Sequence, residues 1–249
     1  MLKRLIVLNL TLMVSFFLSS YSVVEAYQAI KVTKGGRITG KVTLKGKTLK
    51  VKMLAVTKNT EFCGRTTPDP RFEISGNNEI KNVVVTLEGI ERGKKAAPVK
   101  GATLDNKNCV FVPHVQAVTK GTTLTIINSD PILHNTHAYL IRSQRMVFNL
   151  ALPTKGQKIR TRLKKSGMHI IRCDTGNDQM SAFIYVSENP YYAVTDRSGK
   201  FEIADVPPGK YTLKAWHEAF GTMEQKVTIA PRQEVVAGFS FIRNKVGLK

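Results

Sequence analysis

Residues 166–186, SGMHIIRCDTGNDQMSAFIYV, carry the clearest indication of the fold class. Two apolar runs, residues 167–172 and 181–186, flank a polar loop that carries glycine, asparagine and aspartate. Short apolar runs bounded by such turn residues are typical of β-strands. The first run ends at Cys173 and the second begins just after Met180. We therefore expect two neighbouring strands whose connecting loop brings the two sulfur-bearing side chains to the same end.

The same pattern extends over most of the chain from residue 36 onward. Apolar and polar residues alternate in short runs, and turns containing glycine, proline or asparagine separate them; examples are residues 37–44, 82–87, 122–127 and 211–216. Period-two runs with a turn signal roughly every 8–12 residues predict an all-β sandwich or barrel. No amphipathic helix longer than about ten residues is expected.

Composition excludes several classes of protein. The 249 residues include 18 Gly and 3 Cys, which are too few for a collagen-like chain or a disulfide-dense miniprotein, and the apolar content of 42% argues against disorder. Lys and Arg total 38 against 18 Asp and Glu, so the formal charge is +20. This charge favours acidic partners: an acidic protein, an anionic surface or a nucleic acid.

Residues 1–26 have the features of a secretory signal peptide. Lys3 and Arg4 precede an uncharged apolar run, and Val24-Glu25-Ala26 ends like a signal-peptidase site. We expect cleavage after Ala26, a periplasmic or secreted location, and no transmembrane anchor in the mature chain. Export argues against nucleic acid as the partner.

Three side chains form a candidate metal site. His134 follows an asparagine-containing turn upstream of Cys173, and Met180 lies beyond the loop. The order of His, strand-ending Cys, short loop and Met is typical of a blue-copper site, where thiolate and imidazole bind strongly and a thioether is a weak axial ligand. A methionine alone would more often fill a core, so the prediction depends on all three residues together. The remaining histidines that we expect to be structural are His114, His169 and His217.

With these residues in this order, residues 80–188 resemble the plastocyanin-like cupredoxins. The supporting motifs are Phe111-Val112-Pro113, Lys120-Gly121-Thr122-Thr123, the pair His134-Asn135, and Ser166-Gly167. The chain is similar in particular to exported bacterial proteins that join a cupredoxin to a carboxypeptidase-regulatory-like β domain, often labelled methylamine-utilisation proteins. The resemblance implies a Greek-key fold, one copper ion, electron transfer, and an acidic redox partner such as a c-type cytochrome or a dehydrogenase.

One ligand of the family pattern is missing. A second histidine is expected between Cys173 and Met180, and the loop contains none. The family spacing puts it at Gly176, and a shift of one residue puts it at Asn177, whose amide is a harder and weaker ligand than imidazole. His137 faces the opposite side of a regular strand from His134, so it could substitute only if the strand is bulged.

The odd number of cysteines calls for one disulfide and one special thiol. Pairing Cys63 with Cys109 is the economical solution and would stabilise the fold by roughly 3–4 kcal/mol in the chain-constraint model. Cys173 then stays free, and a free thiol in an oxidising compartment must be buried or bound to metal. A buried core cysteine is the alternative interpretation.

A basic strand is a candidate docking site. Alternation in residues 158–165 places Lys158, Arg160, Arg162 and Lys164 on one face. This face could dock an acidic redox partner, or it could be a solvated face that discourages edge-to-edge aggregation. Aromatic residues for stacking on bases are missing, so we expect no nucleic-acid binding.

The C-terminal residues 189–249 are similar to a carboxypeptidase-regulatory-like, transthyretin-type β-sandwich. Turns at Asp196–Gly199 and Pro207–Gly209 separate its strands. The segment is short for such a sandwich, so residues 27–79, with runs at 36–44 and 50–56, could supply missing strands. Two packed domains are the preferred organisation, and a C-terminal sandwich split by the cupredoxin-like segment is the alternative.

Three functions remain open from the sequence. The first is electron transfer through a mononuclear copper site. The second is a Cu(I) carrier or sensor that uses Cys173, His134 and Met180, which together suit Cu(I). The third is a metal-free structural or partner-binding β module. No paired carboxylates, nucleophile elbow or phosphate loop is recognisable, so an enzyme is not expected.

Overall fold

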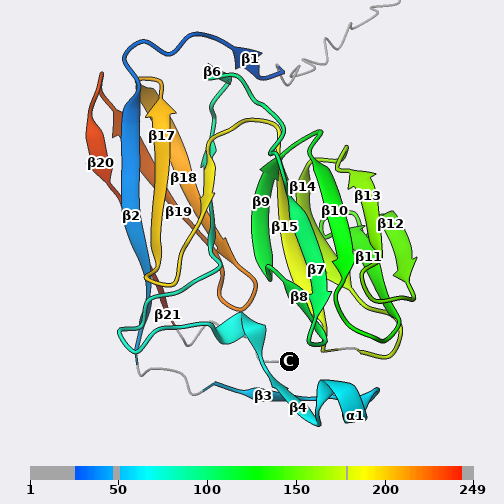
Figure 1. The fold of residues 1–249 in the computed structure, drawn as a ribbon. Coiled ribbons are helices and arrows are strands. Elements are labelled where there is room, and N and C mark those ends of the chain that lie inside the picture. The colour runs from blue at the N-terminus through cyan, green and yellow to red at the C-terminus, as the bar shows by residue number, and fades with distance from the viewer. Residues whose placement is uncertain (1–25, 47–50, 178, 243–249) are drawn as a thin grey trace, which may run out of the picture.

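The computed structural model describes residues 26–46, 51–177 and 179–242, and nearly all of its regular structure is β-strand (Figure 1). The expected all-β fold is therefore confirmed. All but one residue of the expected signal peptide lies outside the described residues. The strands form two groups that lie side by side, one on the left and one on the right of Figure 1.

The first group is a sandwich of two sheets, called here the sandwich module. One sheet has the order β16-β5-β18-β19, and the other has the order β17-β2-β20, with β21 also paired to β2. Its strands are β2 (Gly36–Lys45), β5 (Val84–Glu88), β16 (Tyr192–Val194), β17 (Lys200–Val206), β18 (Gly209–His217), β19 (Gly221–Ile229), β20 (Glu234–Val236) and β21 (Phe239–Ile242). Alternate residues of these strands, including Ile38, Leu213 and Phe241, fill one apolar core.

The second group, called here the inserted module, contains the strands from 103 to 187. Its sheets have the orders β13-β10-β7-β8 and β12-β11-β14-β15-β9. The strands are β7 (Thr103–Lys107), β8 (Val110–Val112), β9 (Val115–Thr119), β10 (Thr123–Asn128), β11 (His134–Leu140), β12 (Met146–Leu152), β13 (Lys158–Arg162), β14 (Gly167–Arg172) and β15 (Ser181–Ser187). A second core lies between the sheets, with Leu124, Ile126 and Ile171 fully buried.

The N-terminal segment completes the sandwich module. β2 lies between β17 and β20, although it precedes them by more than a hundred residues. β5, which the sequence analysis placed in the cupredoxin-like segment 80–188, lies between β16 and β18 instead. The reason is visible in its burial: Val85 and Leu87 enter the sandwich core, while Val84 packs against the inserted module beside Phe183. In the strand order, β2 and β5 thus belong to the same sheets as the C-terminal strands.

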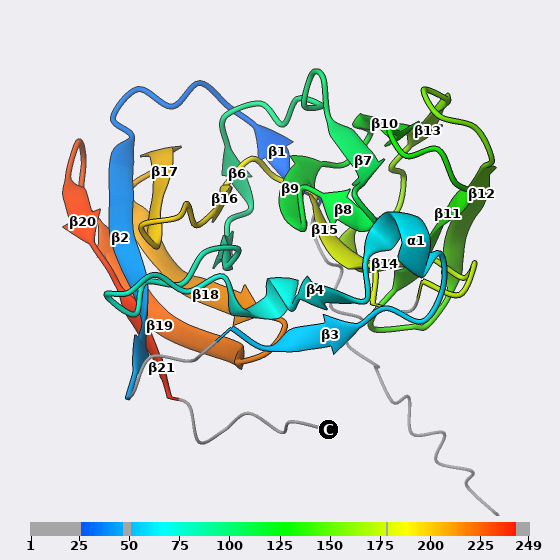
Figure 2. The same cartoon turned by 60° about the horizontal axis from the view of Figure 1, so that its bottom comes forward.

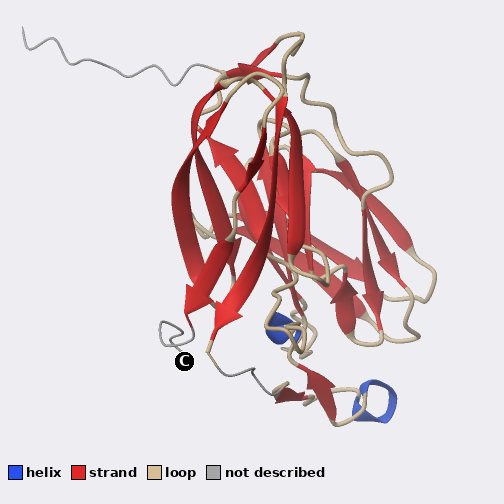
Figure 3. Ribbon diagram, turned by 90° about the vertical axis from the view of Figure 1, so that its left-hand side faces the viewer, coloured by secondary structure: helices blue, strands red, loops and turns tan. Residues whose placement is uncertain are grey.

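Residues 53–68 form a small flap at the lower end of the molecule (Figure 2). β3 (Met53–Ala55) pairs with β4 (Thr66–Pro68), and α1 (Thr60–Cys63) lies between them. The described part of the run at 50–56, residues 51–56, therefore supplies no strand to the sandwich. A disulfide joins Cys63 of the flap to Cys109, the pair that the sequence analysis favoured. Figure 3 shows that the short helices, α1 and η1 (Pro70–Phe72), lie outside the sheets.

Short elements and an apolar interface connect the parts. β1 (Gln28–Ala29) pairs with β6 (Arg92–Gly93) at the opposite end from the flap. Between the two modules, Phe183 contacts Trp216 edge to face, with ring centroids 5.1 Å apart. His114 of the inserted module bonds the carboxylate of Glu218 and the backbone carbonyl of Ser181. The inserted module is thus anchored along one face of the sandwich.

Candidate metal centre

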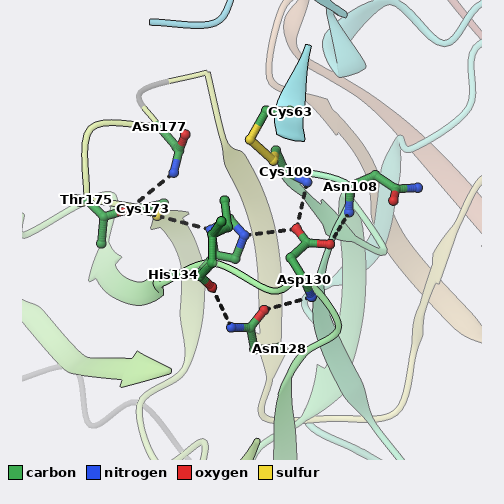
Figure 4. Close-up of a disulfide and its surroundings, with 10 residues drawn as sticks. Cys63, Asn108, Cys109, Asn128, Asp130, His134, Cys173, Thr175 and Asn177 are labelled. Atoms are coloured by element: carbon green, nitrogen blue, oxygen red, sulfur yellow. Dashed lines mark hydrogen bonds and ion pairs between the residues drawn. A yellow bond between two sulfur atoms is a disulfide. The ribbon is translucent and has the colours of Figure 1, made fainter. Parts of the chain in front are cut away.

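Sheet pairing brings the predicted ligand residues to one end of the inserted module. β14 pairs with both β11 and β15, and Arg172 lies opposite Ser181. Cys173 and Met180 consequently lie at the same edge, where His134 begins β11. The Cys173 Sγ is 3.8 Å from His134 Nδ1, and both side chains are buried (Figure 4). Met180 is buried in the same core as Cys173.

Asp130 fixes the orientation of the His134 ring. Its Oδ2 lies 2.9 Å from His134 Nε2 and also accepts the backbone N–H of Cys109, while Oδ1 accepts that of Asn108. Asn128 accepts the Asp130 N–H in turn. A carboxylate on one ring nitrogen holds the proton there, so the other nitrogen presents its lone pair. Here that nitrogen is Nδ1, which faces Cys173.

The surroundings stabilise charge on both groups. Burial alone would raise the pKa of the Cys173 thiol, but hydrogen bonds involving His134, Thr175 and the backbone outweigh it and lower that pKa. Burial alone would lower the pKa of His134, but its contacts with Cys173 and Asp130 outweigh burial and raise it. A thiol whose thiolate is favoured beside an imidazole is chemically suited to bind a metal ion.

Asn177 brings a buried amide to the same loop. Its side chain is fully buried, and Nδ2 donates to the hydroxyl of Thr175, which itself lies 3.1 Å from Cys173 Sγ. The Asn177 Oδ1 is buried and has no hydrogen-bond partner in the described part of the chain. Buried side-chain oxygens are nearly always satisfied, so the orphaned amide oxygen of this loop needs an explanation. The amide nitrogen faces Thr175 and Cys173, and the oxygen points away from them (Figure 4).

A side chain at Gly176 would be strained and would have to displace Lys58. Its φ is +92°, and a Cβ built on it would lie 2.8 Å from Cδ of Lys58, a residue of the flap. The flap is bound to this loop, because Lys58 Nζ donates to the Thr175 carbonyl at 2.5 Å and Thr57 donates to that of Gly176. The family position of the missing histidine is therefore covered by the lysine side chain.

His137 lies on the other side of the sheet and does not join the site. Its Nδ1 contacts the carboxylate of Asp174 and lies 2.7 Å from the Tyr139 hydroxyl. β11 does have an irregularity, but it falls between Ala138 and Tyr139, beyond His137. His134 and His137 consequently keep the opposite orientations of a regular strand.

Lys158, Arg160 and Arg162 lie on the edge strand β13, and Lys164 lies two residues beyond its end. β13 pairs only with β10 at the end of its sheet. Lys158, Arg160, Arg162 and Lys164 are exposed, and none of them forms an ion pair with a described residue. The alternation expected from the sequence is present, with Ile159 and Thr161 half-buried between the charges. The strand thus presents a row of unpaired positive charge.

Sequence reasoning missed Asp130, Thr175 and the flap. Asp130 precedes His134 by four residues, and Pro131 between them indicates a turn. This spacing could have predicted that the Asp130 carboxylate contacts the His134 ring. Nothing in the sequence signals the contact between Lys58 and Gly176, which are separated by more than a hundred residues. Such contacts depend on the three-dimensional path of the chain.

Comparisons with known proteins give likenesses to parts of the chain. The family model of the carboxypeptidase regulatory-like domain matches residues 171–241, and no curated protein matches the chain. Among solved structures, a purple cupredoxin from Nitrosopumilus maritimus is 21% identical, with 34% of this chain and 99% of that one covered and a TM-score of 0.30. A single-residue mutant of amicyanin in its reduced state is 18% identical, with 41% and 98% covered and a TM-score of 0.31.

A copper-containing nitrite reductase from Thermus scotoductus SA-01 is 21% identical over 38% of this chain and 26% of that one, with a TM-score of 0.30. These likenesses cover only part of the chain, so the case for a metal site has to be made from its own residues. Within the described residues, no helix is long and apolar enough to cross a membrane.

Proposed function

We propose that this protein binds one copper ion through Cys173 and His134, with Met180 as a weak ligand. We propose also that the Asn177 amide turns over on metal binding, so that Oδ1 takes the position of the absent imidazole. The observation that carries the proposal is the buried line Asp130–His134–Cys173. The distance of 3.8 Å between Nδ1 and Sγ is shorter than the sum of two metal–ligand bonds of about 2.0 and 2.3 Å, so both atoms can bind one ion.

The chemistry of the donors favours copper. A thiolate and a thioether are soft ligands, and an imidazole suits copper in both oxidation states. Copper bound in this way would supply one-electron transfer, with its potential set by the weak ligand and by burial. The role of this chain is to orient His134 through Asp130, to favour the thiolate of Cys173 and to exclude water from both.

We propose further that the protein is exported, is not an enzyme, and passes electrons to or from an acidic redox protein. The basic row on β13 supports the choice of an acidic partner, because complementary charge steers two redox proteins together. The hydrophobic segment at residues 5–18 supports export.

Visible spectroscopy of the mature chain, residues 27–249, tests the copper site. After addition of Cu(II), we expect an intense thiolate-to-copper band that Cys173→Ser abolishes. Asn177→His should strengthen copper binding and Asn177→Leu should weaken it, because the first adds an imidazole and the second removes the amide oxygen. Gly176→His should do less, since Lys58 occupies its space. No band and no retained copper in any variant would overturn the proposal.

A Cu(I) carrier is the second candidate, and the cover over Gly176 favours it specifically. Gly176 supplies no imidazole and Lys58 covers that position, so the remaining soft donors match Cu(I) better than Cu(II). Competition for Cu(I) against a chelator under reducing conditions decides between the two. Tight Cu(I) binding without a Cu(II) band would identify a carrier, whereas a band with reversible reduction would identify an electron-transfer protein.

A further inference from the structure

A second group of possible ligands lies on the other side of the His134 ring. The Cys109 Sγ, a carboxylate oxygen of Asp130 and a ring nitrogen of His134 all lie within 4.8 Å of one another. Their residues are 2%, 1% and 0% exposed. Figure 4 shows Asp130 on one side of the His134 ring, on the side of the disulfide, and Cys173 on the other side of the ring.

The disulfide keeps this group from acting as a metal site. Cys109 is bonded to Cys63, and only a thiolate is a strong metal ligand. Reduction by a dithiol transfers two electrons and two protons to the bond, which leaves thiols on Cys63 and Cys109 and converts the dithiol to its disulfide.

We propose that reduction of the Cys63–Cys109 disulfide creates a second metal site, in which Cys109 Sγ, Asp130 and His134 Nε2 bind a borderline-soft divalent ion such as Zn²⁺. Sulfur, nitrogen and carboxylate oxygen form a ligand set that zinc accepts. A tetrahedral zinc ion holds its ligand atoms roughly 3.3–3.8 Å apart. The 2.9 Å between Asp130 Oδ2 and His134 Nε2 must therefore lengthen slightly, and movement of Cys109 Sγ must bring any longer separation, up to 4.8 Å, into this range. Once the S–S bond is broken, rotation of the Cys109 thiol allows this, and binding releases the thiol proton to solvent.

The two sites compete for one imidazole. A neutral imidazole has one nitrogen that carries a proton and one that offers a lone pair. If Nε2 binds an ion beside Cys109, Nδ1 holds the proton and cannot bind an ion beside Cys173. The state of the disulfide would therefore decide on which side of His134 a metal is held. Apart from His134, the second site shares no ligand with the proposed copper site, so it stands even if that proposal fails.

Zinc binding by variants in a Cys173→Ser background tests this site, because that background removes the thiolate of the first site. Two further variants form a matched pair. Cys63→Ser and Cys109→Ser both break the disulfide and free the flap, but only Cys63→Ser keeps the proposed sulfur ligand. We expect the Cys63→Ser protein to bind one Zn²⁺ per chain at least tenfold more tightly than the Cys109→Ser protein, as measured by competition with a chromophoric chelator.

A second measurement uses the native disulfide. The Cys173→Ser protein should bind no zinc at this site when oxidised and one equivalent after reduction with a phosphine, which itself becomes the phosphine oxide. Far-UV circular dichroism checks that each protein is folded. Equal zinc affinity in the matched pair, or no uptake by the folded reduced protein, would overturn the second site. Neither result bears on the copper band of the wild-type chain, so the two proposals can fail separately.

Discussion

The sandwich module and the inserted module differ in what they bury. The core of the sandwich consists of apolar and aromatic side chains, with Tyr191 and Phe241 among the largest. Some buried side-chain polar atoms have no hydrogen-bond partner among the described residues. All of these atoms lie in the inserted module, in Asp105, Asn106, His137, His169, Asn177 and Gln179. A buried donor or acceptor without a partner costs about 1–3 kcal/mol.

This contrast in buried polar groups indicates that the sandwich module is the scaffold. Over its described residues, the sandwich satisfies its buried polar side chains, as a module selected for stability would. The inserted module buries Cys173, His134 and Asn177 together and leaves an amide oxygen without a partner among the residues described. Local departures from full satisfaction are expected at functional sites, where they are compensated by stability elsewhere in the fold.

Removing a large core side chain from the sandwich should have the largest effect on stability. Leu213 is fully buried in β18, and Leu213→Ala should lower the free energy of unfolding by about 2–5 kcal/mol. Copper stoichiometry in the native protein should not change. Urea denaturation and metal analysis provide the two measurements, with Leu124→Ala as the matched change in the other core. If Leu213→Ala abolishes copper binding while the protein is folded, the division into scaffold and site is wrong.

A buried histidine of the sandwich module, His217, should lower the stability of the protein at acidic pH. Burial, together with the charge of His114, lowers the pKa of His217 to about 3, while the unfolded chain has its ordinary value of 6.5. Between these values the unfolded state takes up a proton that the folded state refuses, so stability falls as pH falls. At about 1.4 kcal/mol per pH unit, the loss from pH 6.5 to 4.5 is about 2–3 kcal/mol.

Denaturation of wild type and His217→Phe at several pH values isolates this contribution. Burial also lowers the pKa of His169, which acts in the same direction, but His169 is present in both proteins and its contribution cancels. The Phe variant should lose less stability on acidification, and its aromatic ring keeps the stacking on Phe220. Parallel stability curves for the two proteins would show that His217 is not the sensitive group.

In the inserted module, Asp130→Asn should weaken metal binding by about 10–100-fold, because the carboxylate no longer fixes the orientation of His134. Asp105→Asn is the control, since its carboxylate lies in the same module and bonds Ser129 rather than a proposed ligand. Chelator competition measures both affinities. An equal loss in the two variants would indicate a general charge effect.

The smallest effect on stability is expected for the basic row of β13. Replacing Lys158, Arg160, Arg162 and Lys164 by Gln should change the free energy of unfolding by no more than about 0.5 kcal/mol. The rate of electron exchange with an acidic cytochrome, measured by stopped flow at low salt, should fall and lose its dependence on ionic strength. The control replaces Lys31, Lys34, Lys210 and Lys226 of the other part of the chain. The same loss in both variants would argue against docking at β13.

Local pattern predicts much of this molecule, and long-range contacts account for the rest. Alternation and turn residues indicate the strands, and the order of His134, Cys173 and Met180 indicates which side chains meet. The position of β5 is not predictable in this way, because a run such as Val83–Leu87 fits a central strand in either module. Asp130 and Lys58 reach the site because of the path of their loops. The periodicity of apolar residues and the amino-acid composition do not predict such a path.

The proposal for the inserted module is that Cys173 and His134 together bind one copper ion. X-ray absorption at the copper edge of the loaded mature chain tests it most directly. We predict one short copper–sulfur distance together with imidazole scattering, and loss of the sulfur contribution in Cys173→Ser. A first shell of nitrogen and oxygen alone, or a spectrum that Cys173→Ser leaves unchanged, would contradict the claim.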